Sequence, residues 1–187
     1  MMLETSIGQP FGGIIQVAYV VEDLQESMAL YAEKYGIGPW FLSENHAIRD
    51  ARYRGQPTDI SMSIGFGFSG HMCFELIQQL DELPSVYRDV VKARGYGFHH
   101  LGMACRDYDA DLKKYLDMGY ELAFSASTPR GIRFGYMDTL NDFPGMLELI
   151  EVNDTQEKFL RLMREASLGW DGADPIRNVE VITRQLV

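Results

Sequence analysis

The sequence predicts an α+β fold made of two βαβββ modules, and an internal repeat carries this prediction. The stretch that begins at Gln16, QVAYVVEDLQESMALYAEKYG, has the same pattern as the stretch that begins at His100, HLGMACRDYDADLKKYLDMGY. In the same way, HMCFELIQ (71–78) resembles PGMLELIE (144–151). Further strand-like segments lie between the two stretches of each copy. A repeat that includes both the start and the end of a unit indicates two copies of one supersecondary structure.

Each copy opens with a short apolar strand and continues as a helix. Asp23 and Asp107 lie seven residues after Gln16 and His100, where a carboxylate can accept from the free N–H groups of a first helical turn. Apolar residues at helical spacing follow each Asp, namely Leu24, Met28, Tyr31 and Tyr35, and then Tyr108, Leu112, Tyr115 and Leu116. Each helix is predicted to end at a glycine, Gly36 or Gly119, as a left-handed C-terminal cap.

The other strands follow each helix in order. The predicted strands are 40–43 and 60–68 in the first copy and 121–126 and 132–137 in the second, before the closing strands at Glu75 and Glu148. The first copy is longer, because Gln16 to Glu75 spans 59 residues and His100 to Glu148 spans 48. The surplus, residues 46–59, is interpreted as a long loop, and such loops are often lids or binding loops.

Residues outside the repeat join and extend it. Residues 84–94 are typical of a linking helix, and residues 155–166 are predicted to form a third helix behind the capping pattern Asp154-x-x-Glu157. The tail from Asp174 is expected to be an extended arm on the core or on a partner chain. We therefore expect one domain over residues 1–187, with module one at about 12–82, module two at about 96–152, and a C-terminal helix and arm at 153–187.

Composition and charge narrow the class of protein. The formal net charge is −10, so a nucleic-acid partner is not expected. No apolar run is long enough to cross a bilayer, and the N-terminus does not resemble a signal peptide. Cys73 and Cys105 lie in apolar strand-like segments, which favours buried thiols in a reducing, cytoplasmic setting. The sequence contains two groups of basic residues: one is Arg49, Arg52 and Arg54, and the other is Arg130 and Arg133. We interpret both groups as solvated loop residues. The alternative is that one of them binds a substrate carboxylate or phosphate.

The segment from Gly65 to Gly70 matches the glycine pattern of a dinucleotide-binding loop. That pattern requires a helix after it, whereas a strand follows here. We therefore interpret the segment as a turn between strands.

Four polar residues interrupt the apolar strands at matching places in the two copies. The repeat pairs Gln16 with His100, and Glu75 with Glu148. A buried carboxylate is costly unless it is paired or binds a cation, so two of them with an imidazole and an amide predict one divalent metal, such as Zn, Ni, Co, Mn or Fe. Taken singly, each residue could face solvent or form a structural hydrogen bond. His99 is the alternative to His100, because neighbouring strand residues point to opposite faces.

These features resemble the vicinal-oxygen-chelate superfamily, which includes glyoxalase I, methylmalonyl-CoA epimerase, extradiol dioxygenases and the bleomycin and fosfomycin resistance proteins. The paired βαβββ units, the strand–Asp–helix openings and the ELIQ and ELIE strands carry the resemblance over about residues 12–152, and RGYGFHHLGM (94–103) is similar to the epimerases. The resemblance implies a curved mixed sheet around one metal and, by default, a homodimer. The order Gln, Glu, His, Glu is that of eukaryotic-type glyoxalase I.

The resemblance implies a metal-dependent lyase or an isomerase or epimerase that transfers a proton next to a carbonyl of a small molecule. Glu148 is the first candidate for the base and Glu75 the second. Gln16 stands where an extradiol dioxygenase would have His, which disfavours ring cleavage. The alternative is a metal-free protein that binds or sequesters small molecules in an aromatic cleft, as the bleomycin resistance proteins do. Seven aromatic residues in or beside strands could form such a wall, namely Trp40, Phe41, Phe66, Phe68, Phe124, Phe134 and Tyr136.

Overall fold

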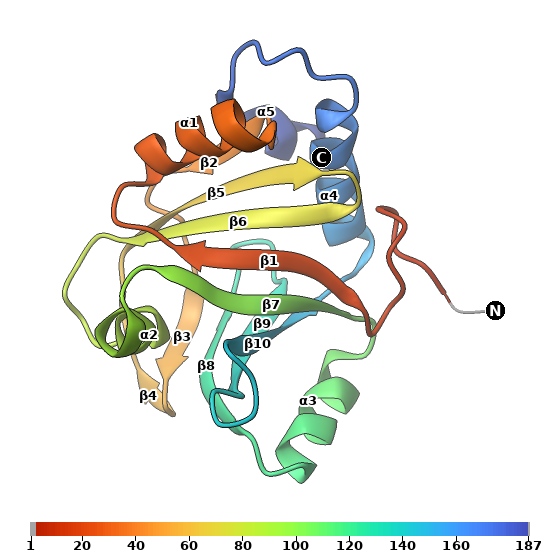
Figure 1. The fold of residues 1–187 in the computed structure, drawn as a ribbon. Coiled ribbons are helices and arrows are strands. Elements are labelled where there is room, and N and C mark those ends of the chain that lie inside the picture. The colour runs from red at the N-terminus through yellow and green to blue at the C-terminus, as the bar shows by residue number, and fades with distance from the viewer. Residues whose placement is uncertain (1–2, 187) are drawn as a thin grey trace.

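The computed structural model of the chain describes residues 3–186, and its centre is one strongly curved mixed sheet (Figure 1). Both predicted modules are present. The first consists of β1 (Ile14–Val20), α1 (Leu24–Tyr35), β2 (Trp40–Ser43), β5 (Met62–Ser69) and β6 (Met72–Gln79). The second consists of β7 (Gly97–Cys105), α3 (Tyr108–Asp117), β8 (Glu121–Ser127), β9 (Arg133–Asp138) and β10 (Met146–Glu151).

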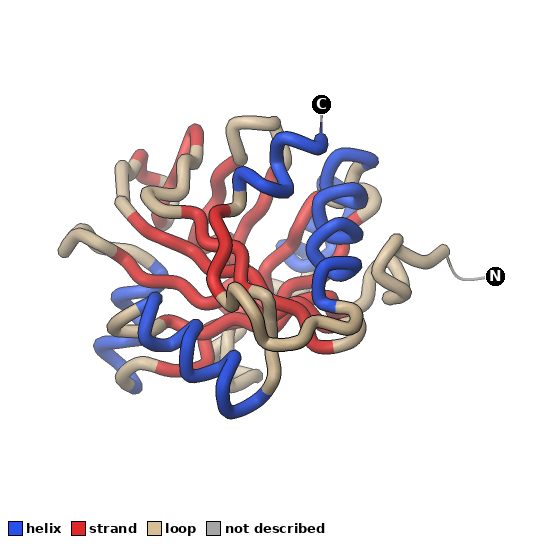
Figure 2. Tube along the Cα trace, turned by 90° about the horizontal axis from the view of Figure 1, so that it is seen from above, coloured by secondary structure: helices blue, strands red, loops and turns tan. Residues whose placement is uncertain are grey.

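The two modules join through their first strands. β1 and β7 are antiparallel neighbours in the middle of the sheet, β6 lies parallel to β1, and β10 lies parallel to β7. The complete strand order is β11-β2-β5-β6-β1-β7-β10-β9-β8-β3-β4. The first and last strands of both modules are therefore four consecutive strands, β6-β1-β7-β10. Figure 2 shows the sheet curving around the interior, with helices along its outside and α4 (Asp154–Ser167) at one end.

The predicted caps of the two repeated helices are confirmed. Asp23 accepts from the N–H of Glu26 at 2.8 Å, and Asp107 accepts from the N–H of Ala110 at 3.0 Å. Gly36 adopts the left-handed conformation with φ 64° at the end of α1. α3 ends one residue earlier than predicted, with Met118 as its cap and Gly119 next at φ 92°.

The prediction of a long loop over residues 46–59 is wrong. This segment forms a hairpin of β3 (Arg49–Tyr53) and β4 (Gln56–Pro57), and β3 pairs with β8 of the other module. Ala51 and Tyr53 lie on either side of the exposed Arg52 in β3 and pack against the core, so this part of the strand is amphipathic. Outside the strand, Arg54 forms ion pairs with three carboxylates, those of Asp89, Glu121 and Asp138.

Two predictions for the C-terminal region need correction. The cap of α4 is Asn153, whose Oδ1 accepts from the N–H groups of Thr155 at 3.0 Å and Gln156 at 3.1 Å, because Asp154 already belongs to the helix. The Glu157 carboxylate accepts instead from the N–H of Ser6. The tail is no simple extended arm: β11 (Ile176–Asn178) pairs with β2, and two short helices follow, α5 (Glu180–Thr183) and a 3₁₀ turn at Arg184–Leu186.

The glycine-rich segment is mostly strand and not a turn. Gly65 and Gly67 lie within β5, and only Gly70 belongs to the turn before β6. A Cβ atom at Gly67 would lie 3.0 Å from the indole of Trp40, which packs directly on the strand. These glycines therefore make room for Trp40, and the segment has no helix after it.

The linking helix is α2 (Val86–Arg94), capped by Ser85. Cys73 and Cys105 are free thiols and both are buried, as predicted. Among the helices of residues 3–186, none is both long enough and apolar enough to cross a membrane.

Candidate metal centre

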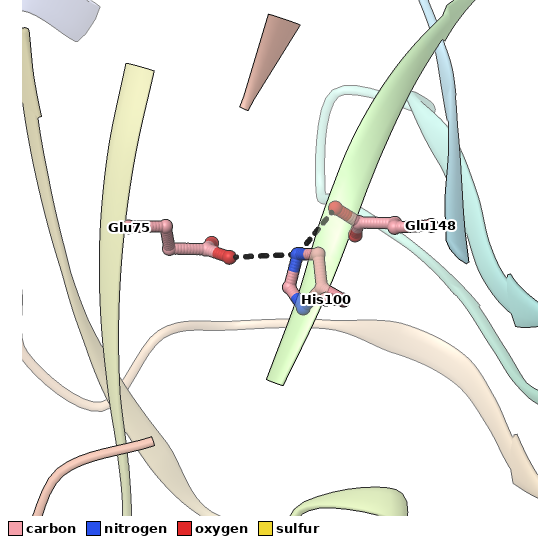
Figure 3. A group of neighbouring side chains, drawn as sticks. All are labelled: Glu75, His100 and Glu148. Atoms are coloured by element: carbon pink, nitrogen blue, oxygen red, sulfur yellow. Dashed lines mark ion pairs between the residues drawn. The ribbon is translucent and has the colours of Figure 1, made fainter. Parts of the chain in front are cut away.

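The four polar residues of the repeat lie on the four central strands. Glu75 is on β6, Gln16 on β1, His100 on β7 and Glu148 on β10. Their exposed fractions are 5%, 4%, 0% and 5%, so all four are withdrawn from solvent. In a flat sheet the outer two strands would lie about 14 Å apart, three strand spacings. The curvature of the sheet brings these strands around one point, and Figure 3 shows Glu75, His100 and Glu148 pointing toward one another.

The donor atoms of these residues converge closely. His100 Nε2 lies 3.1 Å from Glu148 Oε2 and 3.4 Å from Glu75 Oε2. Gln16 Nε2 lies 3.0 Å from Glu75 Oε2, 3.1 Å from Glu148 Oε2 and 3.3 Å from His100 Nε2. Donor atoms of Glu75, His100 and Glu148 all lie within 4.8 Å of one another, so these three residues could hold a metal ion. The Gln16 amide presents its oxygen instead of its nitrogen after rotation about its last side-chain bond.

The chemistry of this donor set fits a divalent ion. Two buried carboxylates face one imidazole, so the cluster with both carboxylates ionised carries an excess of negative charge even when His100 is protonated. Burial raises the pKa of Glu75; the hydrogen bond with His100 lowers it, and the nearby Glu148 carboxylate raises it further. Burial alone would lower the pKa of His100, but the carboxylates of Glu148 and Glu75 raise it to about 9. A cation is therefore strongly attracted here, and the mixed oxygen and nitrogen donors suit Zn, Ni, Co, Mn or Fe.

His99 points away from this cluster and contacts His100 from behind. The two Nδ1 atoms lie 2.9 Å apart, and His99 Nε2 lies 3.2 Å from the carbonyl oxygen of Val86 at the start of α2. Burial, and next the charge on His100, hold the pKa of His99 well below its usual range. His99 is therefore a neutral imidazole wedged between the helix and His100.

Gly102 makes the close approach of the donors possible. It is the register partner of Gln16 on β1 and of Glu148 on β10. A Cβ atom there would lie 2.9 Å from Cβ of Gln16 and 2.8 Å from Cδ1 of Ile150. A side chain at this position would therefore press on Gln16, one of the four donors.

Two tyrosines border the cluster. The Tyr136 ring lies 4.8 Å from the His100 ring between centroids, and the hydroxyls of Tyr136 and Tyr87 are 3.1 Å apart. Burial is the main cause that raises the pKa of both hydroxyls, so both remain protonated at neutral pH. One hydroxyl donates to the other, which leaves one O–H free to donate to another oxygen in the site.

A cavity of about 140 Å³ opens above the cluster. Gln16, Glu75 and Glu148 form its polar end, and apolar side chains from three strands and α4 form its wall. Three of the seven aromatic residues considered from the sequence line it, namely Phe66, Phe134 and Tyr136. The other four, Trp40, Phe41, Phe68 and Phe124, are buried in the core.

The arginines of the two basic groups have different surroundings in the structure. Arg54 and Arg133 are held in ion pairs, whereas Arg130 lines the cavity. The sequence did not place Tyr87 or Phe159 at the site and gave His46 only as a weaker alternative to His100 as a metal ligand; all three line the cavity. Helical apolar spacing is the only signal that Tyr87 and Phe159 carry, and it is equally typical of core residues. His46 has no counterpart in the repeat.

The fold and the cluster together define a class: proteins with paired βαβββ modules and a polar centre between their first and last strands. The family model of the Glyoxalase/Bleomycin resistance protein/Dioxygenase superfamily matches residues 15–136. The chain belongs to this superfamily, and the resemblance inferred from the sequence is confirmed. No curated protein matches the sequence at a significant level.

Solved structures with this fold are distant in sequence. A methylmalonyl-CoA epimerase from Mycobacterium tuberculosis is 20% identical with a TM-score of 0.54, and the match covers 81% of this chain and 93% of that one. A hypothetical protein from Bacillus halodurans C-125 is 16% identical with a TM-score of 0.55, covering 75% and 94%. A methylmalonyl-CoA epimerase in complex with methylmalonyl-CoA and NH4+ is 16% identical with a TM-score of 0.52, covering 75% and 94%. At this identity the comparisons establish the fold, the predicted curved α+β sheet.

Proposed function

We propose that the protein is a metal-dependent lyase or isomerase that transfers a proton next to a carbonyl group of a small molecule. Gln16, Glu75, His100 and Glu148 are the proposed metal ligands. The observation that carries the proposal is the convergence of two buried carboxylates, an imidazole and an amide at the polar end of an apolar cavity. Membership of a superfamily that contains glyoxalases and epimerases supports the same chemistry.

When bound, a divalent ion would polarise the substrate carbonyl and stabilise the negative charge that develops on its oxygen. Glu148 is the proposed base, with Glu75 as the second candidate, and both carboxylates border the cavity. The base takes a proton from the carbon beside the carbonyl and returns it to the other face of that carbon or to a neighbouring atom. The apolar wall limits the access of bulk water to the reacting carbon.

The free hydroxyl proton of the Tyr87–Tyr136 pair is placed to support this step. The pair lies beside His100, and both tyrosines line the cavity. A hydrogen bond from this pair to the carbonyl oxygen would strengthen as negative charge develops there.

The first experiment measures bound metal and proton exchange together. Chelator-treated protein is reloaded separately with Zn, Ni, Co and Mn, and the metal content is determined by mass spectrometry. Exchange of substrate protons for deuterium is then followed by NMR for 2-oxo and acyl thioester compounds. We expect about one ion per chain, no retained ion in His100→Ala, and loss of exchange with retained metal in Glu148→Gln.

Glu121→Gln is the matched control, because this carboxylate lies on the surface and pairs only with Arg54 among residues 3–186. It should retain both metal and exchange. Full exchange activity in Glu148→Gln would rule out Glu148 as the base. Absence of metal in every preparation would overturn the proposed metal centre.

The second candidate function is metal-free binding of a small molecule. The aromatic wall favours it, since Phe66 and Phe159 stack edge-to-face with centroids 5.9 Å apart beside the cavity. Ligand affinity that is unchanged by a chelator, with no proton exchange, would select this function over the enzyme.

A further inference from the structure

The cavity has two chemically different ends, and strand β9 runs along the wall between them. On β9, Tyr136 is the register partner of Glu148 of β10, and Phe134, two residues earlier, is the partner of Ile150. Ile132 and then Arg130 continue in the same direction, in the turn between β8 and β9. At about 3.3 Å per residue, Ile132 lies roughly 13 Å from Tyr136 along the chain. The polar cluster is buried and Arg130 is exposed, so the two lie at the inner and outer ends of the cavity.

Arg130 is the only Lys or Arg side chain among the described residues that line the cavity. Within residues 3–186 its guanidinium has no ion-pair or hydrogen-bond partner, although the chain carries a net charge of −10. Its neighbour Arg133, in contrast, is bound by Glu151 and Asp109. The guanidinium of Arg130 is thus available to a ligand in the cavity, and a guanidinium binds carboxylate or phosphate oxygens in a planar, bidentate manner.

The charges at the two ends fix the orientation of a ligand. With the proposed divalent ion bound, the carboxylates of Glu75 and Glu148 balance its charge, so Arg130 carries the uncompensated positive charge that an anionic group meets in the cavity. An anionic ligand therefore enters with its oxyanion toward Arg130 and its uncharged carbonyl toward the cluster. The 140 Å³ interior, lined by side chains such as Ile64, Phe66 and Phe134, matches the size of cavity that accepts a benzene ring.

We propose that the substrate is a small carbonyl compound with an apolar body of about the size of a benzene ring and an oxyanion that binds Arg130. This inference rests on the proposed function, because it assigns the carbonyl to the polar cluster. It adds that the site selects for a distal negative charge. The shared chemistry is the oxyanion, which can be a carboxylate or a phosphate.

The test uses aryl methyl ketones in which the ring lies between the carbonyl and a distal carboxylate: 4-acetylbenzoate, (4-acetylphenyl)acetate and 3-(4-acetylphenyl)propionate. Their methyl esters and the corresponding phosphate monoesters complete the series. Affinities are measured by calorimetry on the metal-loaded full chain and on three variants, Arg130→Gln, Arg130→Lys and Arg161→Gln. Arg161 is the matched control, because it lies on the exposed part of α4 and pairs with Glu165.

We expect at least one acid or phosphate to bind about tenfold more tightly than its ester. Arg130→Gln should remove this preference without weakening the ester, Arg130→Lys should keep part of it, and Arg161→Gln should leave it unchanged. A stronger effect on the phosphates than on the carboxylates would identify phosphate as the natural oxyanion.

The inference is overturned if acids and esters bind equally, if Arg130→Gln weakens both to the same extent, or if no compound of the series binds at millimolar concentration. Deuterium exchange beside the ketone separates this outcome from the proposed function. Arg130-dependent binding without exchange would refute the function alone, whereas exchange of esters and acids at equal rates and affinities would refute the inference alone.

Discussion

The imidazoles of His99 and His100 face each other through their Nδ1 atoms, 2.9 Å apart. His99 Nε2 lies against the Val86 carbonyl, which can only accept, so His99 must donate there. The neutral His99 then has only an acceptor left at Nδ1, and His100 must keep its proton on Nδ1. His100 is thereby restricted to presenting Nε2 to the carboxylates of Glu75 and Glu148, the arrangement required of a metal-binding imidazole.

Removal of the acceptor behind His100 should weaken metal binding. We expect His99→Phe, which fills the space without accepting a hydrogen bond, to lower metal affinity about 10–100-fold. His99→Asn places an amide oxygen near the position of Nδ1 and should restore affinity to within about threefold. Competition titrations with a chromophoric chelator measure both. Nitrogen-15 shifts of His100 should report loss of the fixed tautomer in His99→Phe only, and equal affinities in the two variants would refute this role of His99.

A methyl group at Gly102 should disturb the donor set from within the sheet. Its Cβ would press on Gln16 and Ile150, so we expect Gly102→Ala to lower the unfolding free energy by about 1–3 kcal/mol and metal affinity at least tenfold. The double variant Gly102→Ala/Ile150→Val relieves only the contact with Ile150. Urea unfolding should show stability largely recovered in the double variant while metal affinity stays low. Recovery of both together would mean that Gln16 is not displaced.

Acid should destabilise the protein partly through protonation of His46. This residue lines the cavity and packs on Phe66, and its Nδ1 lies 2.9 Å from Ser43 Oγ. Burial lowers its pKa from 6.5 to about 4. Between these values the unfolded chain binds a proton that the folded chain does not, so His46 makes stability fall as pH falls through this window. From pH 7 to pH 5 we expect a loss of about 1–2 kcal/mol from this residue.

The measurement compares urea unfolding of the wild type and His46→Gln at both pH values. The variant should lose less stability than the wild type, although His99 contributes a loss of the same sign in both proteins. An equal loss in the two proteins would show that His46 is not protonated preferentially in the unfolded state.

Removal of one carboxylate should stabilise the metal-free protein. Because Glu75 and Glu148 share a single imidazole, Glu75→Gln removes the excess charge and leaves Glu148 paired with His100. We expect the metal-free variant to gain about 1–2 kcal/mol in unfolding free energy. Conversely, added metal should stabilise the wild type by about 2.7 kcal/mol at 100 times its Kd and the variant much less. A metal-free variant less stable than the wild type would contradict this account of the cluster.

The repeat predicted the central part of the fold because the positions of the strands, and the correspondence between the two copies, can be seen in the local sequence pattern. It grouped Gln16 with His100 and Glu75 with Glu148, and the structure places these four side chains in one cluster. The β3–β4 hairpin was missed because Arg49, Arg52 and Arg54 concealed the alternation of Ala51 and Tyr53. The pairing of this hairpin with β8 of the other module depends on the tertiary fold.

The wall of the cavity could not be predicted for a related reason. Phe159 has the same helical spacing as an ordinary core residue, and only the packing of α4 against β5 turns it toward the cavity. Val179, Thr183 and Leu186 reach the cavity because β11 adds to β2 and returns the tail to the site. These residues, like Glu148, lie outside the segment 15–136 that the family model matches, so membership of the superfamily does not by itself specify the wall of the cavity.

The joining of the modules through β1 and β7 makes the donor set a shared property of both halves. Gln16 and Glu75 come from one module and His100 and Glu148 from the other, so neither half contains more than two of the donors. An ion bound by all four would cross-link the two modules, and β1 and β7 could not separate without releasing it. Two fragments produced by cleavage between residues 80 and 84 would then reassociate more tightly when a divalent ion is supplied. Because all four donors are needed, tight binding of the ion would indicate that β1 and β7 have paired in the native register.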